Sequence, residues 1–151
     1  MALRRISMAA LAAVVAAMAA TASAGEGDIK YRQKVMAAVG GHMGAMVTIL
    51  KGQGGNKADI AGHAHAMAEL AKISMHVFPK GSGPMDGKTR AKAEIWEKPD
   101  QFKAVTEAFV RESEMLAKVA KTGDMAAFGA QIGALGKNAC GACHKPFREK
   151  E

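Results

Sequence analysis

The stretch Cys140-Gly141-Ala142-Cys143-His144, close to the end of a 151-residue chain, decides what fold this sequence needs. Its C-x-x-C-H spacing is typical of covalent attachment of a c-type haem. Two thiols can add to the two vinyl groups on neighbouring edges of one porphyrin, and the adjacent imidazole can then reach the iron. A helix suits this task because residues four apart share one face. We therefore predict one haem c, attached through Cys140 and Cys143, with His144 as iron ligand.

Three other uses of two closely spaced cysteines were weighed. A redox-active C-x-x-C pair would want a βαβ context, which the sequence does not indicate. A zinc site would need two further ligands at ordered spacing, and His63 and His65 are two apart, so they point away from each other on a helix. An ordinary disulfide is the third alternative for an exported chain. The haem accounts best for the two cysteines, the adjoining histidine and the helical setting together.

The pattern around this motif predicts four amphipathic helices and no strands. Apolar residues at helical spacing indicate a first helix over residues 29–50, and Asn56 is a plausible N-cap for a second, which Phe78-Pro79 ends. A third begins at Pro99 and closes at Thr122-Gly123, and Asp124 caps a fourth that runs to the chain end. Residues 80–98 form a long connection with one short turn. The expected fold is all-α, an antiparallel four-helix bundle with the haem attached on the C-terminal helix.

The first 24 residues carry the features of a secretory signal peptide. Arg4 and Arg5 precede an uncharged apolar run, which ends in the small-residue pattern Ala22-Ser23-Ala24. A retained membrane anchor is the alternative, but the run is shorter than the ~20 residues that a spanning helix needs. We expect export to the periplasm, cleavage after residue 24, no membrane span after cleavage, and one domain over residues 25–151.

The charge of the mature chain is mildly positive. The whole chain has a formal net charge of +7; removal of the two arginines in the signal, which holds no acid, leaves +5. Because acids and lysines are interspersed, the pattern indicates a solvated surface and no nucleic-acid binding. A mildly basic face is suited to an acidic periplasmic redox partner.

Four further motifs in chain order carry a resemblance to a known family. They are Tyr31-Arg32-Gln33-Lys34-Val35-Met36, Phe78-Pro79 followed by glycines, Ala93-Glu94-Ile95-Trp96, and the closing stretch from His144 to Arg148. Together with C-x-x-C-H they resemble the class II c-type cytochromes, the cytochrome c′ family, including its low-spin members with a methionine ligand. Ala93 departs from the proline that this family has there. The resemblance implies a four-helix bundle with one haem on the last helix.

In that family the residue at the position of Met36 faces the distal side of the haem, and two hypotheses follow. If the Met36 sulfur ligates the iron, the His/Met haem is low-spin, and thioether ligation raises its potential. The chain is then a single-electron carrier, which is the leading expectation. If Met36 only fills an apolar pocket, the iron is five-coordinate and binds nitric oxide or carbon monoxide.

The remaining expectations concern residues near the haem and the assembly. The resemblance places Arg32 near the haem edge, where it can pair with a propionate, and Arg148 beside the proximal imidazole. The other four histidines are expected in surface or polar-network roles, and we expect no enzymatic activity. The resemblance also allows a homodimer packed through the first two helices, where three glycines permit close approach: Gly40, Gly41 and Gly44.

Overall fold

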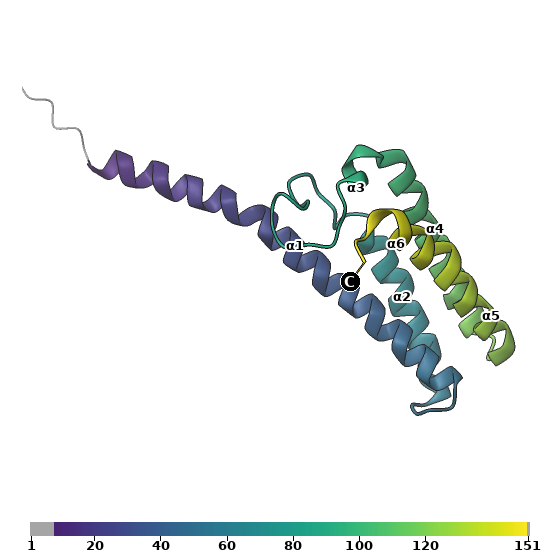
Figure 1. Cartoon of the computed structure of the whole chain (residues 1–151). Coiled ribbons are helices and arrows are strands. Elements are labelled where there is room, and N and C mark those ends of the chain that lie inside the picture. Colours follow the sequence, from purple (N-terminus) through teal and green to yellow (C-terminus); the bar gives the residue numbers. More distant parts are fainter. Residues whose placement is uncertain (1–7, 151) are drawn as a thin grey trace, which may run out of the picture.

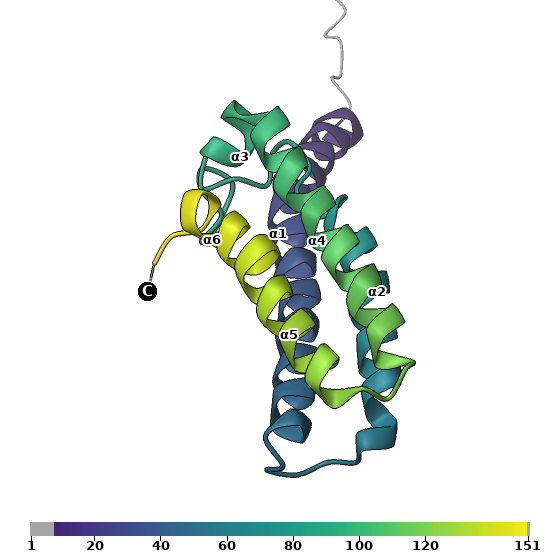
Figure 2. The ribbon, with the colours of Figure 1, turned by 90° about the vertical axis from the view of Figure 1, so that its right-hand side faces the viewer.

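Four helical rods, packed antiparallel, make up the structure, a computed structural model that describes residues 8–150 (Figures 1 and 2). The rods are α1 (Met8–Leu50), α2 (Ile60–Ser74), α4 (Pro99–Ala120) and a composite fourth rod. That fourth rod consists of α5 (Met125–Leu135), a π-helical segment (Gly136–Gly141) and α6 (Ala142–Phe147), and the short α3 (Glu94–Glu97) interrupts the long connection. Over the described residues there is no strand beyond one isolated bridge, and the predicted all-α bundle is confirmed.

The helix starts follow the capping residues that the sequence indicated. The Asn56 side chain accepts a hydrogen bond from the backbone N–H of Ala58 at 2.9 Å, and a 3-10 turn, Lys57–Asp59, then leads into α2. Asp124 Oδ1 accepts from the N–H groups of Ala126 and Ala127 at 2.9 and 3.0 Å. Pro99 occupies the first turn of α4, where its missing N–H has no helical partner to lose.

Three boundaries differ from the expected ones. The α1 helix begins at Met8 instead of residue 29, since the alanine-rich sequence before it favours helix; the predicted signal peptide lies partly outside the described residues. The α2 helix ends at Ser74, four residues before Phe78, because the chain tightens there into a turn with His76 N–H donating to Ile73 O. The fourth rod is not a continuous α-helix, because a π-helical segment interrupts it.

No helix in the described part is long and apolar enough to cross a membrane.

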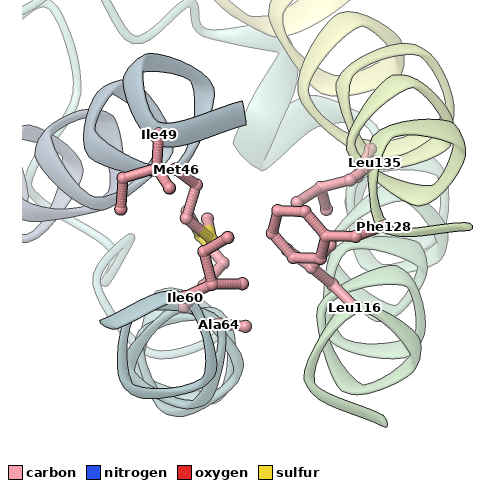
Figure 3. Packing of buried hydrophobic residues seen from close by; sticks show 9 residues of the cluster. Met46, Ile49, Ile60, Ala64, Leu116, Phe128 and Leu135 are labelled. Carbon is pink, nitrogen blue, oxygen red and sulfur yellow. The ribbon is translucent and has the colours of Figure 1, made fainter. Parts of the chain in front are cut away.

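The main core lies at the end of the bundle away from the long connection, where all four rods contribute (Figure 3). Met46 and Ile49 come from α1, Ile60 and Ala64 from α2, Leu116 from α4, and Phe128 and Leu135 from α5. Leu116 and Phe128 are almost fully buried, at 0% and 1% exposure. This core fixes the four rods relative to one another and leaves the opposite end of the bundle to a different packing arrangement.

Glu112 interrupts an apolar heptad pattern on α4, and its contacts explain why a polar side chain lies there. Its carboxylate accepts a hydrogen bond from Gln131 Nε2 at 2.7 Å and one from Asn138 Nδ2 at 3.1 Å. Gln131 lies on α5 and Asn138 lies in the π-helical segment, so one side chain of α4 holds both halves of the fourth rod. The polar residue at an otherwise apolar position therefore braces the segment that leads into the cysteine motif.

We predict that Leu116→Ala lowers the free energy of unfolding by about 2–5 kcal/mol, since it removes a fully buried side chain and leaves a cavity. The neighbouring Met115 is 47% exposed, so Met115→Ala should cost less than about 0.5 kcal/mol. Urea unfolding followed by circular dichroism measures both values. Equal losses for the two variants would contradict the packing described here.

Candidate functional site

A cavity of about 530 Å³ lies in the bundle between α1 and the C-terminal rod, with α4 and the long connection completing its walls. The six residues predicted from the sequence to form the site all line this cavity: Arg32, Met36, Cys140, Cys143, His144 and Arg148. Its volume is within the usual range for cofactor and ligand pockets. The remainder of the lining is largely apolar, with Phe78, Phe102 and Phe109 among its aromatic members.

The C-terminal wall carries the two thiols and the imidazole. Cys140 lies in the π-helical segment, and Cys143 and His144 lie in the first turn of α6. Both cysteines are free and half-buried, so no disulfide competes for them. The expected continuous α-helix is interrupted by a wider π-helical segment that ends within the motif, at Gly141, and such segments occur frequently at functional sites. The segment is tight at Gly141, where a Cβ atom would lie 3.2 Å from the Gly136 carbonyl oxygen.

Burial controls the ionisation of the thiols. Removal from water raises the pKa of the free Cys143 thiol to about 11, with the neighbouring Cys140 adding to the shift and the Arg148 charge opposing it. Burial also raises the pKa of the Cys140 thiol. Both groups are therefore protonated in the folded chain at neutral pH, and neither has the thiolate character of a redox-active cysteine.

The imidazole of His144 is kept neutral. Burial lowers its pKa below the ordinary histidine value, and the positive charges of Arg148 and Arg90 act in the same direction. A neutral imidazole is the form that ligates a metal. Arg148 lies near this imidazole, and its backbone N–H donates to His144 O at 3.1 Å.

The facing wall belongs to α1. Met36, Val39, Gly40 and Met43 line the cavity at helical spacings of three and four, so they form one face of the helix. Met36 is half-buried. Gly40, Gly41 and Gly44 are exposed, and a Cβ atom at any of them would meet no described atom within 4 Å. The close approach that these glycines permit is therefore not used within the described part of the chain.

Arg32 anchors the long connection at the edge of the cavity. Its side chain is 3% exposed, and its Nη1 donates to Val77 O at 3.3 Å and to Ser82 Oγ at 2.7 Å. Its Nη2 donates to Ser82 O at 2.8 Å and Thr89 Oγ1 at 2.9 Å, and its guanidinium lies 5.0 Å from the centre of the Phe78 ring. Burial lowers its pKa, opposed by the Asp28 charge. The predicted propionate contact would have to use Nε or replace one of these bonds.

The connection also closes over the C-terminal wall. The Trp96 ring N–H donates to the carbonyl oxygens of Phe78 and Pro79 at 3.2 and 3.1 Å, so this residue ties the two ends of the connection together. The Phe102 ring makes edge-to-face contacts with Phe78 and Phe147, at 4.8 and 5.3 Å between ring centres. Glu149 N–H donates to Arg90 O at 2.8 Å, so the end of the chain is tied to the same connection.

Several lining residues were not predicted from the sequence. Thr89, Arg90 and Ala91 reach the cavity only because the connection folds back over it, and no local spacing indicates that path. Val39 and Phe109 had been assigned to apolar helix faces, and the structure shows that those faces line a cavity. The helical period could place them on one side of a helix, but not decide what lies opposite.

Comparison with known proteins identifies the family of the chain that carries this cavity. The profile of the family described as cytochrome c′ matches residues 27–148. The chain belongs to the cytochrome c′ family. It is 39% identical over 124 residues to cytochrome c′ from Pararhodospirillum photometricum, covering 82% of this chain and 98% of the relative. It is 36% identical to cytochrome c′ from Rhodospirillum rubrum, covering 96% and 97%, and 33% identical to cytochrome c-556 from Agrobacterium tumefaciens, covering 83% and 99%.

Solved structures agree with this assignment. A carbon monoxide-bound variant of cytochrome c′ from Alcaligenes xylosoxidans has a TM-score of 0.74 at 29% identity, covering 83% of this chain and 97% of that one. A nitric oxide complex of another variant has the same values. Membership of this family confirms the covalent haem c, and the residues fit such a group: two free thiols and a neutral imidazole share one wall of an apolar cavity.

We predict that Arg32→Ala lowers the free energy of unfolding by roughly 3 kcal/mol or more, because buried carbonyl and hydroxyl partners lose their donors. It should also speed proteolytic cleavage within residues 79–92. The control is Gln33→Ala, whose exposed side chain makes one bond to Lys88 O at 3.0 Å and should cost less than about 1 kcal/mol. Similar cleavage rates in both variants would show that Arg32 does not hold the connection.

A second prediction concerns the free thiol of Cys143 in haem-free protein that retains its helical circular dichroism. With its pKa raised from 9.0 to about 11, it should react with iodoacetamide at about pH 8 roughly a hundredfold more slowly than in the unfolded chain. Peptide mass spectrometry in the absence and presence of urea measures the two rates. Equal rates would mean that the fold does not bury this thiol.

Proposed function

We propose that this chain is a periplasmic haem c protein that binds diatomic gases, nitric oxide or carbon monoxide, on the α1 side of its cavity. When bound, the haem supplies an iron centre with an open coordination position. His144 serves as the proximal ligand, and Cys140 and Cys143 hold the group covalently. The observation that carries the proposal is the apolar α1 wall, which faces the thiols and the imidazole and offers no second imidazole among the described lining residues.

The composition of that wall favours a small uncharged ligand. Past Arg32 and Gln33 at the edge of the cavity, the α1 wall carries no charge and no strong hydrogen-bond donor; it consists of Met36, Val39, Gly40 and Met43. A diatomic gas needs only a small apolar volume, which a half-buried methionine can vacate by a change of rotamer. The relatives with solved structures include nitric oxide and carbon monoxide complexes of cytochrome c′, which supports the same ligand class here.

The sequence had favoured an electron carrier in which Met36 ligates the iron. That hypothesis receives less support than the gas-binding one, because the solved relatives carry gas ligands at a comparable fold and no observation favours a Met36–iron bond over packing of this side chain. In the proposal Met36 therefore acts as a plug: its side chain fills the pocket on the α1 side of the haem and moves aside when a gas molecule binds. Arg148 and Arg90 keep positive charge near the proximal imidazole.

The cellular setting is also part of the proposal. The pattern at residues 1–24 supports export and cleavage, and the residues after it contain the complete match to the family, 27–148. Exchange of electrons with periplasmic redox proteins would then keep the iron in the state that binds gas. A homodimer through α1 and α2 would place the open glycine positions outside the cavity, Gly41 and Gly44, against a second copy.

The decisive test uses Met36→Leu, which keeps the apolar volume but removes the sulfur. If Met36 is a plug, ferrous wild-type protein has a high-spin spectrum, carbon monoxide shifts it fully, and Met36→Leu leaves the ferrous spectrum unchanged. A low-spin wild-type spectrum that Met36→Leu converts to high-spin would establish the electron carrier instead. Optical spectra with and without carbon monoxide distinguish these outcomes.

The plug also predicts a size effect. Met36→Ala should raise the affinity for carbon monoxide by about tenfold, since the ligand no longer displaces a partly buried side chain whose full burial is worth about 1.5–3 kcal/mol. Met43→Ala is the matched control, because this methionine lies two turns further along the same cavity wall. An equal gain in both variants would mean that the gas does not bind beside Met36.

A further inference from the structure

Outside the haem cavity, a pair of histidines links α1 to α2. The Nδ1 atoms of His42 and His63 lie 2.9 Å apart, and their rings meet edge to face with centres 5.1 Å apart and planes at 64°. Both side chains are half-buried, and neither lines the cavity. This contact agrees with the polar-network role expected for these histidines, and it is independent of the haem.

The chemistry of this contact is that of two lone pairs and one proton. When both rings are neutral, one Nδ1 must donate its hydrogen and the other must accept it. If the donor ring takes its other neutral tautomer, with the hydrogen on Nε2, both Nδ1 atoms have a free lone pair and they stay close together between the helices. A neutral imidazole nitrogen is the commonest protein ligand for a transition metal.

The spacing of the two nitrogens matches a particular metal geometry. Metal–imidazole bonds are about 2.0–2.1 Å long. Two such bonds at a right angle place their nitrogens about 2.9 Å apart, the separation observed here. Right-angled nitrogen ligands are typical of tetragonal Cu²⁺ and Ni²⁺ sites, and Cu²⁺ binds more strongly than the other divalent first-row metals at a given site.

We infer that His42 and His63 form a two-histidine chelate for Cu²⁺ that bridges α1 and α2. The ring whose Nδ1 carries the hydrogen binds the metal after that hydrogen has moved to its Nε2 by exchange with solvent, so both imidazoles bind as neutral ligands and no proton is lost overall. No cluster of three or more His, Cys, Asp or Glu side chains exists in the described part of the chain. The other coordination positions therefore belong to water, and the site is an exchangeable one.

The test is calorimetric titration of Cu²⁺ into the ferric, haem-loaded mature protein. Ferric protein is used because it cannot reduce the added metal. We expect one equivalent whose affinity falls at least tenfold in His42→Gln and in His63→Gln, since even outer-shell partners of a metal ligand are worth 10–100-fold. The matched control is His65→Gln. His65 lies on α2, two residues after His63, and its side chain is exposed. It should bind as wild type does.

A second measurement keeps the test valid if a variant folds poorly. Because the metal would bridge two helices of the folded state, Cu²⁺ should raise the Tm of wild type and His65→Gln, and raise it less in His42→Gln and His63→Gln. Haem spectra and circular dichroism check that each variant is folded. Equal affinities and equal Tm shifts in all four proteins, or an equal loss in His65→Gln, would overturn the proposal and leave a hydrogen-bonded pair only.

Discussion

In the proposed site one cofactor is held by three residues of a single helical rod, and this requirement constrains the rest of the bundle. Cys140, Cys143 and His144 must all face one cavity, and they do so across a π turn that ends where α6 begins. A wider turn within a helix needs support from outside, because its geometry is intrinsically unfavourable. Glu112 on α4 supplies it through Asn138, within the widened turn, and through Gln131 on α5.

The two ends of the bundle are packed differently for this reason. At one end, side chains from all four rods close a continuous apolar core around Phe128 and Leu116. At the other end the rods stay apart, and a long connection held by Arg32 covers the gap. The buried arginine there has hydrogen-bond partners for both of its Nη atoms, which is the condition under which a buried charge is tolerated.

The sequence predicted the helices and the haem motif well because both are encoded locally. Helical periods, the caps Asn56 and Asp124, and C-x-x-C-H each depend on residues a few positions apart. The path of residues 80–93 could not be predicted, since it depends on contacts between residues more than forty positions apart, such as Arg32 with Ser82. The π turn was missed because no residue pattern in 136–141 separates it from an α-helix. The assignment of Met36 stayed open because one side chain can either fill a pocket or ligate iron.

The position of the haem motif at the end of the chain has a consequence for the order of assembly. Residues 8–120, which supply three of the four rods, leave the ribosome before Cys140 does, so the cavity cannot close while the chain is still being made. Once closed, the fold holds both thiols protonated and out of water, a state in which they are poor partners for bond formation. We therefore expect covalent attachment to take place on the open chain. The bundle would then fold around a group it already carries, and its last segment, tied to Arg90 through Glu149, would close it.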